Sequence, residues 1–119
     1  MYVIDDDEGV RNSTVFLLAT LGYDCVTFAG AAPFLDAADA LPRGCVLTDL
    51  RMPDMDGFEL AEGLRGRGVG WPVLLITSDS GDRLDRRAAQ LGFAGVLQKP
   101  LDADRLDEAL ASAFADFQR

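Results

Sequence analysis

Five short apolar runs recur along this chain and leave room for one helix after each. Every run is four or five residues long and mostly continuous, without the alternation typical of a strand with one face in water. Buried strands of parallel sheets have this composition. The runs are residues 2–5, 25–28, 45–49, 72–76 and 95–98. We therefore expect five strands that are covered on both faces.

The segments between these runs have helical spacing. Leu106, Leu110 and Ala113 lie at steps of four and three, and the other connecting segments follow the same pattern. Pro33 is expected to open a short helix over 33–40, and the last helix is expected over 103–117. Repeats of strand then helix predict an α/β fold, with a five-stranded parallel sheet and helices on both faces. Ligands of such sheets bind at the carboxyl ends of the strands.

Polar side chains stand where four of these runs end. They are Asp5 and Asp6 after the first run, Asp49 at the end of the third, Thr77 after the fourth and Lys99 after the fifth. We expect them to gather at one edge of the sheet. Carboxylates about 4 Å apart repel by about 4 kcal/mol per pair at an effective dielectric of about 20, so the cluster either takes up a proton or holds a cation. Oxygen ligands without histidine or thiolate favour Mg²⁺.

Lys99 is the only lysine of the chain, and the other ten basic residues are arginines. An ammonium group is a compact charge on a flexible stem, suited to contact one phosphoryl oxygen. A hard cation, a carboxylate, a hydroxyl and an ammonium together are typical of a phosphoryl-transfer site. The nucleophile would be a carboxylate oxygen, and the hydroxyl of Thr77 would meet the bound phosphoryl group.

Each of these residues also has a structural explanation. Asp7 and the glutamate that follows it could simply cap the next helix. Asp54 and Asp56 lie in a turn and are interpreted as turn formers rather than ligands. A single lysine in an arginine-rich chain can arise by chance. The joint pattern at the strand ends, rather than any one residue, carries the functional prediction.

Composition excludes several classes of function. The net charge of −9 argues against direct nucleic-acid binding, which needs a basic face. The chain has no histidine, so histidine metal ligands and a Ser-His-Asp triad are excluded. Cys25 and Cys45 are interpreted as buried thiols of a cytoplasmic protein. No apolar stretch approaches a membrane span, no signal peptide is expected at the start, and 1–119 is expected to form one domain.

Four segments together resemble the receiver domain of bacterial two-component response regulators. The most specific is Asp49-Leu-Arg-Met-Pro-Asp-Met-Asp-Gly57, and with the residues around Gly81 it is most similar to the FixJ subgroup. The other three are Ile4-Asp5-Asp6, Leu75-Ile76-Thr77-Ser78 and Gln98-Lys99-Pro100. The resemblance covers essentially the whole chain. It implies a flavodoxin-like fold with strand order 2-1-3-4-5, which would keep Cys25 and Cys45 too far apart for a disulfide.

The resemblance also implies a role for each matching residue. Asp49 would be the phosphorylated aspartate. Asp6 and Asp49 would bind Mg²⁺ through side-chain oxygens, Arg51 through its carbonyl, and Asp5 mainly through a metal-bound water. Lys99 would contact Asp49 and then the phosphoryl group, and Thr77 would move toward that group on activation. In this family the peptide bond before Pro100 is often cis.

Three positions set this chain apart or tune its site. Family members usually carry Tyr or Phe three residues before the lysine, where this chain has Val96. A valine cannot report phosphorylation by ring rotation. Either the output surface switches differently, or the domain passes the phosphoryl group onward rather than switching strongly, or Val96 has only a packing role. Arg51 and Asp79 occupy the two positions that tune such sites. We expect their opposite charges to pair across the mouth of the site and to hinder attack by water.

The resemblance implies that the chain takes a phosphoryl group from a phosphohistidine on a sensor histidine kinase or a histidine phosphotransfer protein. It would then signal by conformational change or onward transfer, without turnover of an external substrate. A vestigial receiver that acts as an interaction module is the alternative, and the complete residue set argues against it. A haloacid dehalogenase type of phosphatase needs an acid where Arg51 stands.

A homodimer through the fourth and fifth helices is left open. Val10, Arg11 and Thr14 are expected to contribute to the face that meets the partner kinase.

Overall fold

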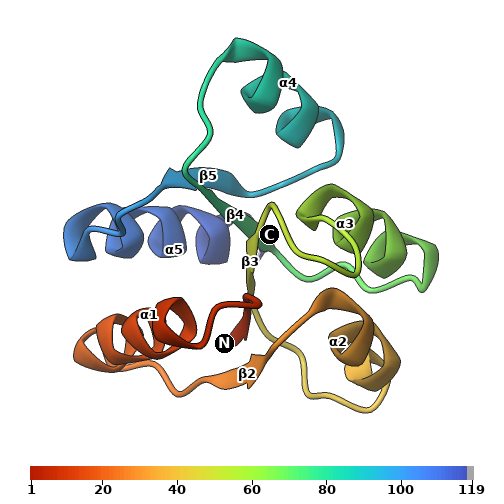
Figure 1. Ribbon diagram of the computed structural model, residues 1–119, viewed down its shortest axis with the longest axis horizontal. Helices are drawn as coiled ribbons and strands as arrows, with labels where there is room; N and C mark the ends of the chain where they lie inside the picture. Colours follow the sequence, from red (N-terminus) through yellow and green to blue (C-terminus); the bar gives the residue numbers. More distant parts are fainter. Residues whose placement is uncertain (118–119) are drawn as a thin grey trace.

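A computed structural model describes residues 1–117 of the chain, with side chains through residue 115. Its five strands are parallel and form one sheet in the order β2-β1-β3-β4-β5, which Figure 1 shows nearly edge-on. The strands are β1 (Tyr2–Ile4), β2 (Val26–Phe28), β3 (Val46–Asp49), β4 (Val73–Thr77) and β5 (Gly95–Gln98). The α/β fold and the strand order that the sequence predicts are confirmed.

A helix follows each strand. The helices are α1 (Glu8–Thr20), α2 (Ala31–Ala38), α3 (Gly57–Gly66), α4 (Asp82–Gln90) and α5 (Ala103–Phe117). In Figure 1, α1 and α5 cover one face of the sheet, α2 and α3 cover the other, and α4 lies beyond the β5 edge. All connections run from the carboxyl end of one strand to the amino end of the next, so the loops after the strands collect at one edge.

An apolar layer fills each side of the sheet, because successive strand residues point to opposite faces. On one side, Ile4 and Val46 pack with Phe34 of α2 and Leu60 of α3. The other layer contains Val3, Leu47 and Leu74 from the strands and Leu18, Leu106 and Leu110 from α1 and α5. Burial of each leucine contributes roughly 1.5–3 kcal/mol. These contacts hold the central strands firmly. The expectation that all five strands are covered on both faces is wrong for β2, where Val26 is 50% exposed because this strand lies at the edge of the sheet.

Element boundaries differ from the sequence prediction at a few points. The second helix begins at Ala31 rather than at Pro33, which becomes its third residue. Proline is tolerated there because the first helical turn has no internal acceptor for its missing N–H. The first strand ends at Ile4, one residue earlier than predicted, and Thr77 is the last residue of β4 rather than following it. Thr77 is paired with Gln98 of β5, which extends the strand by that residue.

The sequence also led to predictions about the two cysteines and about membrane-spanning segments. Cys25 and Cys45 are free thiols as predicted, but only Cys45 is buried, whereas Cys25 is partly exposed beside the edge strand β2. Among the described residues, no helix combines the length and apolar character that crossing a membrane requires.

Candidate functional site

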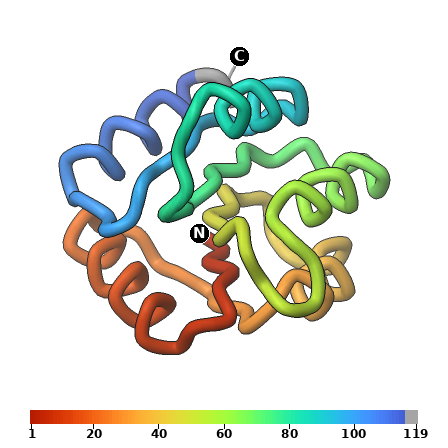
Figure 2. Tube along the Cα trace, turned by 45° about the horizontal axis from the view of Figure 1, so that its top comes forward, coloured from red at the N-terminus to blue at the C-terminus, as the bar shows by residue number. Residues whose placement is uncertain are grey.

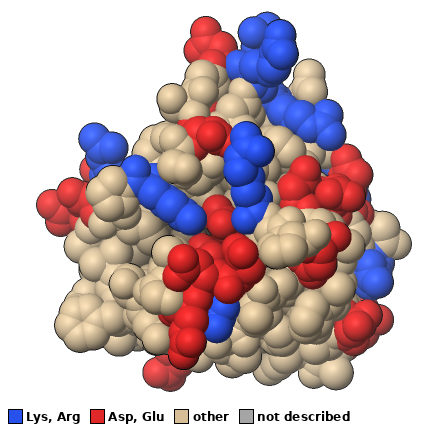
Figure 3. All heavy atoms as spheres, viewed as in Figure 1, with Lys and Arg blue, Asp and Glu red and all other residues tan. Residues whose placement is uncertain are grey.

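Three carboxylates meet at the carboxyl ends of β1 and β3. Asp5 and Asp6 directly follow β1, and Asp49 is the last residue of β3. One oxygen from each lies within 4.8 Å of the other two, and Figure 3 shows acidic side chains gathered at the centre of this face. Asp5 is buried, Asp49 is half-buried and Asp6 is exposed. The predicted cluster therefore forms, and it opens to solvent on the side of Asp6.

Main-chain and arginine contacts orient the buried part of this cluster. The N–H of Asp7 donates to Asp5 Oδ1 at 2.9 Å, and the N–H of Leu50 donates to Asp49 Oδ1 at 2.9 Å. Nη1 of Arg11 donates to the carbonyl of Asp5 at 2.7 Å. The sequence did not predict this contact, because nothing in the residue pattern distinguishes Arg11 from any other arginine on a helix. Arg11 thus stabilises the turn that carries Asp5.

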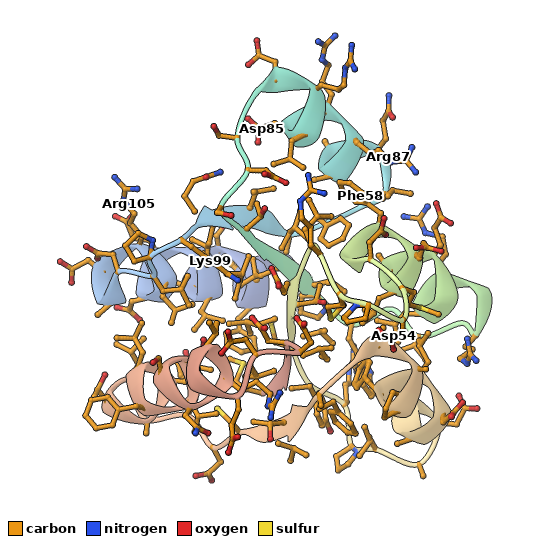
Figure 4. The ribbon with its side chains drawn as sticks, in the orientation of Figure 1. Asp54, Phe58, Asp85, Arg87, Lys99 and Arg105 are labelled. Atoms are coloured by element: carbon orange, nitrogen blue, oxygen red, sulfur yellow. The ribbon has the colours of Figure 1, made fainter. Side chains whose placement is uncertain are left out.

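Lys99 brings its ammonium group to the same cluster from the end of β5. Its Nζ lies 3.2 Å from Asp49 Oδ1 and 3.5 Å from Asp5 Oδ2, and Figure 4 shows the side chain reaching toward the centre of the site. The N–H of Lys99 donates to the carbonyl of Thr77 at 2.9 Å, which fixes the start of the side chain. The Lys99-Pro100 peptide bond is cis, as the family resemblance implies. The contact between Lys99 and Asp49 is as expected from the sequence.

The charges in the cluster perturb one another. Burial raises the pKa of Asp5, and the negative charges of Asp49 and Asp6 add to this, while the Asp7 N–H and Lys99 oppose it. Burial alone would lower the pKa of Lys99, but its hydrogen bond to Asp49 and the charges of both aspartates outweigh burial and raise it. The ammonium is therefore charged at neutral pH, and the cluster has an excess of negative charge.

Thr77 stands at the end of β4, next to this cluster, and is buried. Its Oγ1 accepts a hydrogen bond from the N–H of Asp79 at 3.0 Å. The carboxylate of Asp79 is in turn paired with Arg51, whose Nε and Nη2 both lie 2.8 Å from Asp79 Oδ2. The predicted pairing of Arg51 with Asp79 is present. It joins the loop after β3 to the loop after β4, beside the carboxylate cluster.

Two of the acids that were not assigned to the site, Asp7 and Asp56, cap helices. Asp7 caps α1 by accepting from the N–H of Val10 at 3.1 Å. Asp56 and Glu59 form a reciprocal capping box at the start of α3. Asp54 belongs to the same loop, but it contacts another helix, α2, at a main-chain N–H. The acidic pair of the site is therefore Asp5 and Asp6, not Asp6 and Asp7.

The residues present fit a hard divalent cation. All three ligand side chains of the cluster are carboxylates, the type of donor that Mg²⁺ prefers. With every group ionised, the single charge of Lys99 leaves two negative charges of the three aspartates uncompensated. Arg51 lies two residues after Asp49, so its carbonyl belongs to the same loop end, while its side chain turns away to Asp79. Burial is the main cause of the raised pKa of Asp5, and a divalent ion at this acidic pocket would relieve the repulsion by Asp49 and Asp6 that adds to it.

A groove of about 850 Å³ opens beside Lys99, between α1 and the segment after β5. Its lining is largely apolar and includes Val10, Leu17, Pro100 and Leu101. Thr14 also lines the groove, whereas Arg11 is engaged with the Asp5 carbonyl. Of the three residues expected at the partner face, two are therefore at this groove.

Comparison with known proteins gives one consistent family. The response regulator receiver domain matches residues 1–111. The transcriptional regulatory protein FixJ of Bradyrhizobium diazoefficiens is 40% identical over 113 residues, which cover 95% of this chain and 55% of that protein. FixJ of Azorhizobium caulinodans is 43% identical over 102 residues, covering 86% and 48%. The chain thus spans about half the length of these curated relatives.

Solved structures agree with the sequence comparison. The crystal structure of FixJ-N has a TM-score of 0.86 at 32% identity and covers 94% of this chain and 90% of its own. Full-length FixJ from B. japonicum has a TM-score of 0.87 at 39% identity and covers 96% and 56%. The FixJ-like character indicated by the segment from Asp49 to Gly57 is therefore confirmed by both kinds of comparison.

Proposed function

This chain belongs to the response regulator receiver domain family, and we propose that Asp49 is the residue on which it accepts a phosphoryl group. Domains of this family are phosphoryl-accepting signalling domains of two-component systems. The observation that carries the assignment to Asp49 is the position of Lys99, whose Nζ lies 3.2 Å from the Asp49 carboxylate beside two further aspartates. We further propose that residues 1–119 form one receiver domain.

The chemistry follows from the charges at the strand ends. A carboxylate oxygen of Asp49 attacks the phosphorus of a phosphohistidine on the partner. The O–P bond forms as the N–P bond breaks, and the imidazole nitrogen keeps the electron pair and takes a proton from solvent. Lys99 exchanges its contact with Asp49 for a phosphoryl oxygen, and Thr77 gives up the Asp79 N–H and donates its hydroxyl to the same group.

Magnesium is the proposed cofactor. Asp6 and Asp49 would hold it through carboxylate oxygens and Arg51 through its carbonyl, with Asp5 acting mainly through a bound water. When bound, the ion neutralises charge on the transferred group. The aspartates fit this role because they bring two negative charges more than Lys99 can balance.

A sensor histidine kinase or a histidine phosphotransfer protein is the proposed donor. The phosphohistidine must come within reach of Asp49, and the apolar groove beside Lys99 offers a surface for the helix that carries it. Leu17→Asp and Leu101→Asp would place a charge in that groove. Both are expected to slow transfer from the partner kinase and to leave phosphorylation by acetyl phosphate unchanged. An equal loss with both donors would contradict docking in the groove.

We also propose three wider features of the protein. It turns over no external substrate. Its location is cytoplasmic, which the two free thiols support. We propose a homodimer through α4 and α5, which would pair Arg83 and Arg86 of one copy with exposed acids of α5 such as Asp107 and Glu108 in the other. Nucleic-acid contacts by these residues stay disfavoured by the net charge of −9.

The experiment that separates this function from a vestigial interaction module is phosphorylation by a small donor. The protein is incubated with acetyl phosphate, with and without Mg²⁺, and its intact mass is measured. A gain of one phosphoryl group that requires Mg²⁺ and is lost in Asp49→Asn is expected. The matched control Asp56→Asn changes an acid that only caps α3 and should keep the gain. No gain in the wild-type protein, with acetyl phosphate or with a phosphorylated kinase, would favour the interaction module.

A further inference from the structure

The loop after β3 is held by its main chain only at its two ends, where the N–H of Leu50 donates to the carbonyl of Ile76 and the N–H of Gly57 donates to the carbonyl of Leu50. This acceptor loop, residues 50–56, joins Asp49 to α3 and contains the proposed carbonyl ligand of Arg51. In the described part of the chain, no hydrogen bond between main-chain groups involves residues 51–55. Between these ends, side-chain contacts hold the loop. Arg51 pairs with Asp79 on the β4 side, with the arginine side chain 79% exposed, and Asp54, which is also exposed, makes the contact on the α2 side.

Asp54 ties the acceptor loop to a rigid helix. Its Oδ2 accepts from the N–H of Ala32 in the first turn of α2 at 2.8 Å, and its Oδ1 accepts from the N–H of Met55 at 2.9 Å. Figure 4 shows Asp54 above the start of α2, and Figure 2 shows the two segments side by side. The hydrogen bonds, that to Ala32 first, lower the pKa of Asp54, so it is charged at neutral pH.

The start of α2 is built to receive this carboxylate. Its N-cap residue is Gly30, which has no side chain to cap the helix. A Cβ at Gly30 would come within 2.8 Å of Asp54 Oδ2. Pro33 lacks an N–H, so the first turn offers few donors and Asp54 takes one of them. A residue 22 positions away in sequence thus provides the cap that α2 lacks locally.

We propose that Asp54 is a positioning residue for the phosphoryl-transfer site. By anchoring the acceptor loop on α2, it holds the Arg51 carbonyl where Mg²⁺ binds. The inference rests on the proposed function for the identity of the ion and of the loop ligand. Because Asp54 also caps α2, its removal has a structural effect that must be separated from this positioning effect.

A second substitution makes that separation. Asp54→Ala removes both the cap and the anchor. Adding Gly30→Asp to it restores a cap from within α2, because the new side chain can accept from the Ala32 N–H once the Asp54 carboxylate is gone. The extended backbone of Gly30, with φ −168° and ψ 170°, admits an aspartate. The double variant therefore has a capped helix and a free loop.

The test measures Mg²⁺ binding by calorimetry, together with amide hydrogen exchange in α2 and in the acceptor loop. Asp54→Ala is expected to weaken Mg²⁺ binding about tenfold and to speed exchange in both segments. The double variant should recover exchange protection in α2 but keep the weak binding and the fast loop exchange. Gly30→Ala, in which the new methyl group displaces the carboxylate, should weaken binding in the same way as Asp54→Ala.

Wild-type Mg²⁺ affinity in Asp54→Ala would overturn the inference, and so would recovery of affinity in the double variant, since capping alone would then suffice. Should the double variant fail to fold, Gly30→Ala decides: unchanged affinity there overturns the inference. A wild-type protein that binds Mg²⁺ but takes no phosphoryl group would contradict the proposed function and leave the Asp54 result valid.

Discussion

Nζ of Lys99 lies 3.2 Å from Oδ1 of Asp49, although the two residues are 50 positions apart in the chain. They meet because β3 and β5 flank β4 and end at the same edge of the sheet. The contact places the chain's single lysine against the proposed phosphoryl acceptor.

Lys99→Arg is expected to keep the fold but to uncouple phosphorylation from any conformational response. The planar guanidinium keeps the positive charge, but it cannot place that charge at one point between Asp5 and Asp49. Stability should change by less than about 1 kcal/mol. Urea unfolding and hydrogen exchange with and without phosphorylation measure the two effects. Arg105→Lys, on the exposed surface of α5, is the matched control. A full exchange response in Lys99→Arg would contradict the assigned role.

Asp6→Asn is expected to stabilise the protein without Mg²⁺, by about 1 kcal/mol. Removing one charge relieves the repulsion among three carboxylates that lie within 4.8 Å. The same change should abolish the stabilisation that Mg²⁺ gives the wild type. Urea unfolding at several Mg²⁺ concentrations measures both. An unchanged Mg²⁺ effect would show that Asp6 is not a ligand.

Arg51→Asn and Asp79→Ala are each expected to speed hydrolysis of the aspartyl phosphate, by roughly tenfold if the pair raises the barrier by about 1.4 kcal/mol. The two side chains meet at 2.8 Å in the loops beside the cluster, where we expect them to hinder the approach of water. Loss of phosphoryl label over time gives the rate. Arg83→Gln, which removes an exposed arginine of α4, should leave it unchanged. If the aspartyl phosphate is hydrolysed no faster in either variant than in the wild type, the pair does not hinder attack by water.

The stability of the fold is expected to fall as the pH rises from about 9 to about 11. Burial raises the pKa of Cys45 from 9.0 in the unfolded chain to about 11 in the folded one. The unfolded state loses this proton first, so stability is fully present below pH 9 and declines through pH 11, by up to about 2.7 kcal/mol. Unfolding curves of the wild type and Cys45→Ala isolate this effect from other groups. Parallel pH profiles for the two proteins would contradict it.

Most of the fold was predictable because strands and helices are each indicated by apolar residues close together in the sequence. Continuous apolar runs such as that ending at Asp49 indicate buried strands, and positions such as Leu106 and Leu110 indicate the helix face that covers them. The start of α2 was not predictable. Its cap comes from Asp54, far away in sequence, so the local signal pointed to Pro33 instead.

The site was predictable only as a set of side chains at strand ends. That reasoning placed Asp5, Asp49 and Lys99 together, whereas the pair of Arg51 with Asp79 was predicted from the family resemblance. Two hydrogen bonds were not predicted: that from Arg11 to the Asp5 carbonyl, and that from the Asp79 N–H to the hydroxyl oxygen of Thr77. Both depend on main-chain positions that only the folded loops define. Val96 is half-buried on β5, and the consequence of its replacing an aromatic ring stays a prediction.

Asp49 is the proposed phosphoryl acceptor, and the arginines on either side of it in the sequence make a direct test possible. Cleavage after Arg43 and Arg51 releases residues 44–51, in which Asp49 is the only acid. The protein is phosphorylated by acetyl phosphate with Mg²⁺ and treated with borohydride, which reduces an aspartyl phosphate to homoserine, and the peptides are then analysed by mass spectrometry. We expect homoserine in peptide 44–51. Its appearance instead in peptide 1–11, which carries Asp5 and Asp6, or in no peptide at all, would contradict the account.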